Sequence, residues 1–135
     1  MGSRKKAASR RRPAPGSYAY QGLDRVLHEK ARLGILTALV TQAEGALFTE
    51  LKEFCSLTDG NLSRHLQVLQ EAGLVEIWKG TEGGRPQTLV RLSEPGRSAF
   101  QSYLAELEQV IEDARRGTRA GSARDLDAPP GWVPA

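Results

Sequence analysis

Residues 57–75 read LTDGNLSRHLQVLQEAGLV, and this stretch decides the fold. At about 100° per residue, its leucines line one side of a helix predicted over residues 58–72. These leucines are Leu62, Leu66 and Leu69. Gly73 fits the left-handed position that ends many helices, and Leu74 supplies the apolar residue that usually follows it. The stretch therefore predicts an amphipathic helix with a sharp end.

A shorter helix is predicted just before it, over residues 49–55. Thr49 is expected to be its N-cap, with Leu51 and Phe54 facing inward. About three residues then connect the two helices, a length typical of helix-turn-helix units. Farther upstream, apolar residues recur at helical spacing between positions 23 and 40 and predict another helical region.

Downstream of Leu74 the hydropathy period drops to two. Residues 75–79 and 88–92 are therefore predicted to be strands. Residues 80–87 between them hold three glycines and a proline, so the hairpin is expected to have a long flexible tip.

Ser93 is predicted to cap a final helix, in whose first turn Pro95 is tolerated. Apolar residues along this helix are spaced 4, 3, 4 and 3, which is typical of a helix that pairs with another helix. We expect this seam to form a dimer interface, with docking onto its own domain as the alternative. The seam consists of Phe100, Leu104, Leu107, Ile111 and Ala114.

The predicted fold is mainly α with a small β-hairpin (α+β), a winged helix-turn-helix with a C-terminal dimerisation helix. The ordered domain is expected over residues 18–114, with the dimerisation helix starting at about residue 94. Residues 1–17 and 115–135 contain too little apolar bulk to offset the entropy of ordering, and both are expected to be disordered tails.

Composition narrows the possible functions. The chain has 135 residues and a net charge of +3, but six of its basic residues lie within the first twelve, so the remainder is mildly acidic. No apolar run approaches the ~20 residues of a membrane span, so we expect a cytoplasmic protein. Cys55 is the only cysteine, which excludes an intramolecular disulfide and any multi-cysteine zinc site.

The polar face of the helix over residues 58–72 is the main candidate site. In a helix-turn-helix pair the second helix enters the major groove of DNA. Arg64 would grip guanine, Gln67 suits adenine, and Ser63 would contact a base or a phosphate. Gly60 lets the backbone approach closely, while Asn61 lies at the rim. A solvated helix face is the alternative for this set.

Backbone contacts to DNA are expected from two other places. Lys79 and Arg85 flank the glycine-rich tip, and a loop that presents arginine suits a phosphate or a narrow minor groove. N–H groups at the helix starts near Thr49 and Thr58 are suited to hold phosphates.

The stretch over residues 57–75, together with residues 23–36 and 84–97, resembles small bacterial winged-helix regulators of the MarR/ArsR type. The similarity extends over roughly residues 20–112. It implies a homodimeric transcription factor, usually a repressor, on a near-palindromic DNA operator. The metal-sensing branch uses paired cysteines beside the helix-turn-helix, which this chain lacks.

No catalytic set, phosphate-binding glycine loop or metal-ligand spacing is present, so neither an enzyme nor a cofactor is expected. His65 is predicted to be a packed core histidine and Cys55 a buried apolar residue, with redox sensing as the alternative for the thiol. Two other functions stay open: a winged-helix module that docks a polypeptide, and non-specific architectural DNA binding led by the basic tail.

Overall fold

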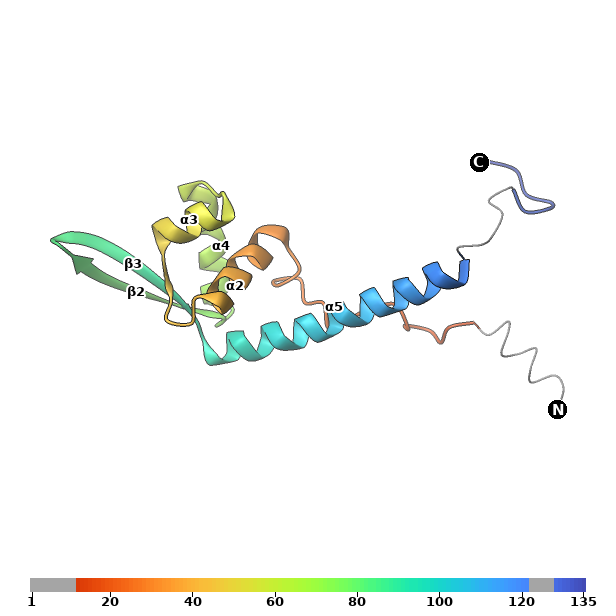
Figure 1. Cartoon of the computed structure of the whole chain (residues 1–135), viewed down its shortest axis with the longest axis horizontal. Helices are drawn as coiled ribbons and strands as arrows, with labels where there is room; N and C mark the ends of the chain where they lie inside the picture. Colours follow the sequence, from red (N-terminus) through yellow and green to blue (C-terminus); the bar gives the residue numbers. More distant parts are fainter. Residues whose placement is uncertain (1–11, 122–127) are drawn as a thin grey trace.

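The computed structural model describes residues 12–121 and 128–135. Most of the first predicted tail and part of the second therefore lie outside the described residues. Figure 1 shows three short helices in a cluster, a hairpin projecting from one side and a long helix extending to the other. The elements are α2 (Lys30–Thr41), β1 (Ala46–Leu47), α3 (Phe48–Cys55), α4 (Asp59–Glu71), β2 (Val75–Glu82), β3 (Arg85–Leu92) and α5 (Glu94–Gly121).

The three strands form one antiparallel sheet in the order β1-β3-β2. This architecture confirms the predicted winged-helix fold. The short strand β1 escaped prediction because two residues are too few to show a period. The hairpin is also more regular than expected. Pairing continues to Glu82 and Arg85, and Gly83 and Gly84, with φ of 59° and 80°, close it in two residues. The expected long flexible tip is wrong because two successive glycines accept the positive φ angles of a tight hairpin turn.

The region before α2 differs from the prediction. Residues 20–29 form a series of turns in place of a helix, although Leu27 is buried as its spacing indicated. The Asp24 side chain accepts the N–H of Val26, and the Glu29 side chain accepts the N–H of Arg32 at 2.9 Å. The Asp24 bond competes with helix formation, and the Glu29 bond caps the first turn of α2, so the helix begins only at Lys30.

Two predictions for helix α3 are wrong. Its N-cap is Leu47 and not Thr49, because Leu47 is held extended in β1 while Glu50 accepts its N–H at 2.8 Å. Leu51 is fully buried as predicted, but Phe54 is 54% exposed. The helix is only eight residues long and ends where Ser56 takes a left-handed φ of 54°. Leu51 is the residue of α3 that is fully buried, Phe48 and Cys55 pack partly against the core, and Phe54 lies beside α2 at the surface.

Helix α4 agrees with its sequence signals. The hydroxyl of Thr58 caps it by accepting the N–H of Asn61 at 3.2 Å. Gly73 has a φ of 77°, and the N–H of Leu74 donates to the carbonyl of Leu69 at 2.9 Å, as a left-handed helix end requires. The three leucines of its apolar side are all buried.

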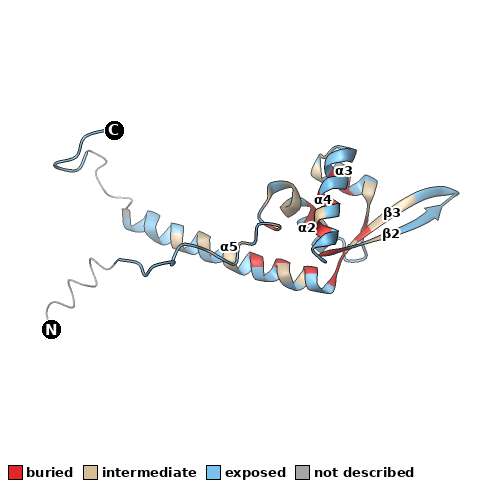
Figure 2. Ribbon diagram, turned by 180° about the vertical axis from the view of Figure 1, so that it is seen from behind, coloured by how far each residue is buried: buried red, intermediate tan, exposed pale blue. Residues whose placement is uncertain are grey.

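Helix α5 is longer than expected, and one residue of its predicted apolar seam is buried within its own chain. It continues past Ala114 to Gly121, where Arg116 and Arg119 lie within ion-pairing distance of Asp113 and Glu112. Phe100 is buried in the core of its own chain beside Tyr103, so it is not available for the expected dimer interface. Figure 2 shows that the buried residues of α5 lie in its first half, next to the helical cluster.

Tyr20 ties the N-terminal segment to the far half of α5. Its hydroxyl donates a hydrogen bond of 2.7 Å to Asp113 Oδ2. This bond raises the pKa of Tyr20 to about 12 and is the main cause of a lowered pKa at Asp113. Because the folded carboxylate has a lowered pKa, its contribution to stability is present above the ordinary carboxyl pKa and is lost as the pH falls.

The Tyr20→Phe protein is therefore expected to show a lower Tm than the unmodified chain at neutral pH and a smaller difference at acidic pH, because protonation of Asp113 removes the charge that the hydroxyl stabilises. Thermal unfolding followed by circular dichroism at the two pH values measures this. An equal difference at both values would mean that the Asp113 charge plays no part.

Candidate nucleic-acid interface

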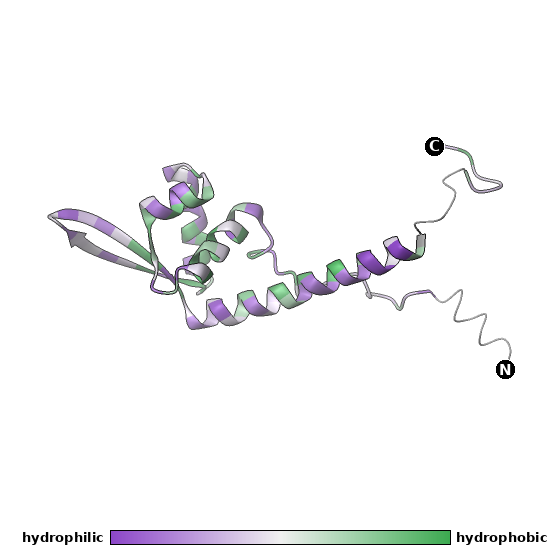
Figure 3. Ribbon diagram, viewed as in Figure 1, coloured by the Kyte–Doolittle hydropathy of each residue, from purple (hydrophilic) through white to green (hydrophobic). Residues whose placement is uncertain are grey.

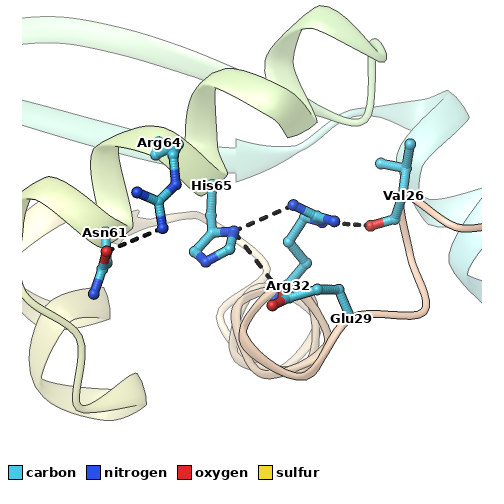
Figure 4. A network of polar contacts seen from close by, with 6 residues as sticks. All are labelled: Val26, Glu29, Arg32, Asn61, Arg64 and His65. Atoms are coloured by element: carbon cyan, nitrogen blue, oxygen red, sulfur yellow. Dashed lines mark hydrogen bonds and ion pairs between the residues drawn. The ribbon is translucent and has the colours of Figure 1, made fainter.

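The outward side of α4 carries all five residues predicted to contact bases. Every one of them is exposed, and they are Gly60, Asn61, Ser63, Arg64 and Gln67. Arg64 Nη2 donates to Asn61 Oδ1 at 3.1 Å, as Figure 4 shows, and Gln67 Nε2 donates to Glu71 Oε2 at 3.2 Å. Exposed side-chain pairs of this kind contribute little free energy, so both donors can be released to a ligand.

The inner side of α4 is held against α2 by a polar network. His65 is 9% exposed, and its Nδ1 lies 3.3 Å from Arg32 Nη1 and 4.0 Å from Glu29 Oε1. Arg32 Nε in turn donates to the carbonyl of Val26 at 2.7 Å (Figure 4). The N–H of Arg32 is the main cause of a lowered pKa at Glu29. The prediction of a packed histidine is confirmed, and the network joins α4 to the start of α2 on the side where the leucines of α4 are buried.

Sequence reasoning missed Glu29 and Arg32 as the residues that orient α4. They lie more than thirty positions upstream of His65. The signal that existed was local: an acidic residue three positions before an arginine at a helix start. Nothing in the sequence indicated that the pair would face α4.

The hairpin, or wing, carries two residues predicted to contact the DNA backbone. One of them lies beside α4 and the other lies at the end of the hairpin. Lys79 on β2 borders a shallow groove together with Ser63 and Gln67, and its Nζ donates to Thr88 Oγ1 at 3.1 Å. Arg85 is exposed at the tip of the hairpin, opposite Glu82. Lys79 therefore places a positive charge beside α4, and Arg85 places another at the end of the hairpin.

Carboxylates stand at both helix starts that were predicted to hold phosphates. Asp59, the first residue of α4 after Thr58, pairs with Lys52 at 2.8 Å. Glu50, next to Thr49, uses its carboxylate to accept the N–H of Leu47. An anion at Thr58 or Thr49 would therefore share the helix start with a negative charge.

The outer face of the wing carries a contact that the sequence did not reveal. The guanidinium of Arg91 lies 5.3 Å from the ring centre of Trp78, which is half-exposed, and 3.5 Å from Glu76 Oε1. Strand register brings these residues together, since Glu76 is paired with Arg91 and Trp78 with Leu89.

The three-helix cluster, the hairpin wing and the exposed polar side of α4 define a winged helix-turn-helix protein. The chain belongs to the family described as the winged helix DNA-binding domain, whose sequence model matches residues 31–111. This family agrees with the resemblance to winged-helix transcriptional regulators that the sequence showed.

Several known proteins are similar to this chain. Uncharacterized protein MJ0432 of Methanocaldococcus jannaschii is 40% identical over 89 residues, which cover 66% of this chain and 96% of that protein. The uncharacterized HTH-type transcriptional regulator YdgJ of Bacillus subtilis is 28% identical over 118 residues, which cover 81% of this chain and 71% of YdgJ. A transcriptional regulator homologue from Pyrococcus horikoshii OT3 superposes with a TM-score of 0.63 at 32% identity, and the match covers 67% of this chain and 89% of that protein.

A more distant structure shares the fold alone. The M. tuberculosis regulator MosR, crystallised with DNA, has a TM-score of 0.55 at 19% identity, with 95% of this chain and 84% of MosR covered. YdgJ and the Pyrococcus horikoshii protein are named transcriptional regulators, a class of protein that is not enzymatic, which agrees with the prediction that the chain is not an enzyme. Within residues 12–121 and 128–135, no helix is long and apolar enough to cross a membrane.

Proposed function

We propose that this protein binds double-stranded DNA sequence-specifically as a homodimer and represses transcription from a near-palindromic operator in the cytoplasm. The observation that carries the proposal is the exposed side of α4, where Ser63, Arg64 and Gln67 lie together with no other part of the described chain covering them. An α-helix of this width fits the major groove of B-DNA.

Base contacts would come from the five exposed residues of α4. Arg64 would exchange its bond to Asn61 for the O6 and N7 of guanine, and Gln67 would exchange Glu71 for adenine. Gly60 would leave room for the backbone, and Ser63 would bond to a base or a phosphate. Lys79 would contact the phosphates beside α4, and Arg85 would enter the flanking minor groove. Thr49 and Thr58 remain candidate phosphate contacts.

Helix α5 supports the homodimer. Leu104 and Ile111 are 41% and 43% exposed, and Ala114 and Leu107, the latter partly packed against the core of its own chain, belong to the same stripe. Figure 3 shows hydrophobic residues recurring along α5 where it has left the helical cluster. An apolar stripe on a projecting helix is expected to pair with a second helix. Two-fold symmetry then sets the half-sites about one helical turn apart, or a multiple of it.

Selection from random duplexes, with size measurement of the bound species, tests this proposal. We expect an inverted repeat bound by two chains, whose affinity falls linearly with salt on a log–log plot. Recovery of asymmetric single sites bound by one chain would contradict the homodimer. Affinity for a polypeptide that varies little with salt would favour the protein-interaction alternative. Deletion of residues 1–17 is expected to weaken binding; complete loss would indicate an architectural role led by the basic tail.

A further inference from the structure

Helices α2 and α3 border an open groove of about 840 Å³ that the proposed DNA contacts and the α5 stripe leave unused. Leu33, Gly34 and Ala38 line its α2 side, and Phe54 and Cys55 its α3 side. The opposite side of α2 packs into the core through Ile35, Leu36 and Leu39. A helix that is apolar on both sides is normally buried on both. The groove is therefore a surface that a partner is expected to cover.

The two most exposed large apolar side chains of the described residues belong to the segment over 128–135, here called the arm. Trp132 is 72% exposed and Val133 is 84% exposed. The arm already holds a defined turn, because the N–H of Trp132 donates to the carbonyl of Pro129 at 3.1 Å and Gly131 has a φ of 86°. Proline followed by glycine at the centre of such a turn restricts the chain before any binding event. Trp132 is thus presented on a partly preordered segment.

We propose that the arm of one chain docks into the α2–α3 groove of a second copy, with the Trp132 ring against Phe54. This inference rests on the proposed homodimer and adds a second contact to the α5 stripe. Proline-rich segments bind aromatic-lined apolar grooves because little conformational freedom is lost on docking. Each partner would bury a surface that the single chain leaves exposed.

Because α5 is long, the arm would reach the groove of another molecule more easily than the groove of its own chain. From Phe100 to Gly121 the helix covers about 30 Å, and the chain from Gly121 to Pro129 spans at most ~29 Å when fully extended. Even a fully extended connection would therefore bring the start of the arm back along α5 only about as far as Phe100. Its own groove is bordered by α2 and α3, which pack mainly on each other, on the sheet and on α4 and make few contacts with α5. A two-fold axis perpendicular to α5 would instead bring the end of each helix toward the partner's helical cluster.

Docking at this place would also affect α4. The groove includes Ser56 and Leu57, which form the connection from α3 to α4. Ser56 is one of two non-glycine residues in the described chain with a positive φ. An arm packed against this connection would hold the helix that presents Arg64, so each chain would steady the DNA-contacting helix of the other.

Disulfide trapping tests the contact with the full chain. The Val133→Cys protein keeps Trp132 and carries one other thiol, Cys55, which lines the groove. Mild oxidation with copper–phenanthroline in air is expected to form a disulfide between Cys55 of one chain and the introduced thiol of another, identified by peptide mass mapping. Adding Thr37→Glu, which places a charge in the groove, should reduce this disulfide at least ~10-fold. Adding Val40→Glu, an equal change on α2 outside the groove lining, should leave it intact.

Two results would overturn the inference. One is a yield of the disulfide between Cys55 and the introduced thiol no higher than the background of a control that also carries Cys55→Ser. The other is a disulfide that forms within one chain only. Operator binding by the Trp132→Ala protein separates this inference from the proposed function. If the trapping fails while two chains still bind an inverted repeat, only the arm contact is wrong. If no inverted repeat is bound by any variant, the proposed function fails as well.

Discussion

The Arg64→Ala protein is expected to bind its selected operator more weakly by ~1–3 kcal/mol, and to lose its preference at one base pair of each half-site. The reason is that a guanidinium grips the O6 and N7 of guanine through two parallel hydrogen bonds, which alanine cannot replace. The side chain is exposed and its one intramolecular bond is to Asn61, so its removal should leave the fold unchanged.

Binding isotherms on the selected operator and on its single-base variants measure this effect. Arg116→Ala is the matched control: it removes the same charge from the second half of α5, where the arginine pairs with Asp113 at 2.8 Å. Figure 1 shows that this half of α5 extends away from the helical cluster. Its operator preference should equal that of the unmodified chain. Unchanged base preference in the Arg64→Ala protein would reject the assigned contact, whatever happens to overall affinity.

The Gly96→Ala protein is expected to lose about 3 kcal/mol of unfolding free energy. A Cβ at position 96 would lie 2.0 Å from the carbonyl oxygen of Leu74 and 2.8 Å from its carbonyl carbon. Because these are backbone atoms, no side-chain rotation relieves the clash. The same glycine donates its N–H to Ser93 Oγ at 2.9 Å, so any shift of the backbone also disturbs the cap of α5.

Chemical denaturation and thermal melts report the loss, which should lower the Tm by more than ~10 °C in a domain of this size. Gly117→Ala provides the control on the same helix, since a Cβ there meets nothing within 4 Å. Alanine is the better helix former, so this variant should be as stable as the unmodified chain or gain up to ~1 kcal/mol. Equal behaviour of the two variants would show that the close contact with Leu74 is not rigid.

Features set within a few residues of the chain could be predicted. The cap at Thr58, the end of α4 at Gly73 and the cap at Ser93 each depend on one side chain or one backbone angle. The exposed position of Arg64 and Gln67 followed from the helical period alone. These signals are short-range, so they act before distant parts of the chain meet.

Features that depend on distant packing could not be predicted. The approach of Lys79 to Gln67 depends on how the sheet packs against α4. The pairing of Arg32 with His65 depends on the angle between α2 and α4. The strand β1 exists only because β3 lies beside it.

The amino-acid sequence by itself determined the order of the helices and of the two hairpin strands, and the side of α4 that faces outward, because these follow from local period and capping. Only the tertiary structure decided the burial of two aromatic residues: Phe100 entered the core of its own chain, while Phe54 stayed at the surface. The physical reason is that a hydrophobic side chain gains free energy from any apolar surroundings, and the sequence does not specify which neighbours the fold will bring to it.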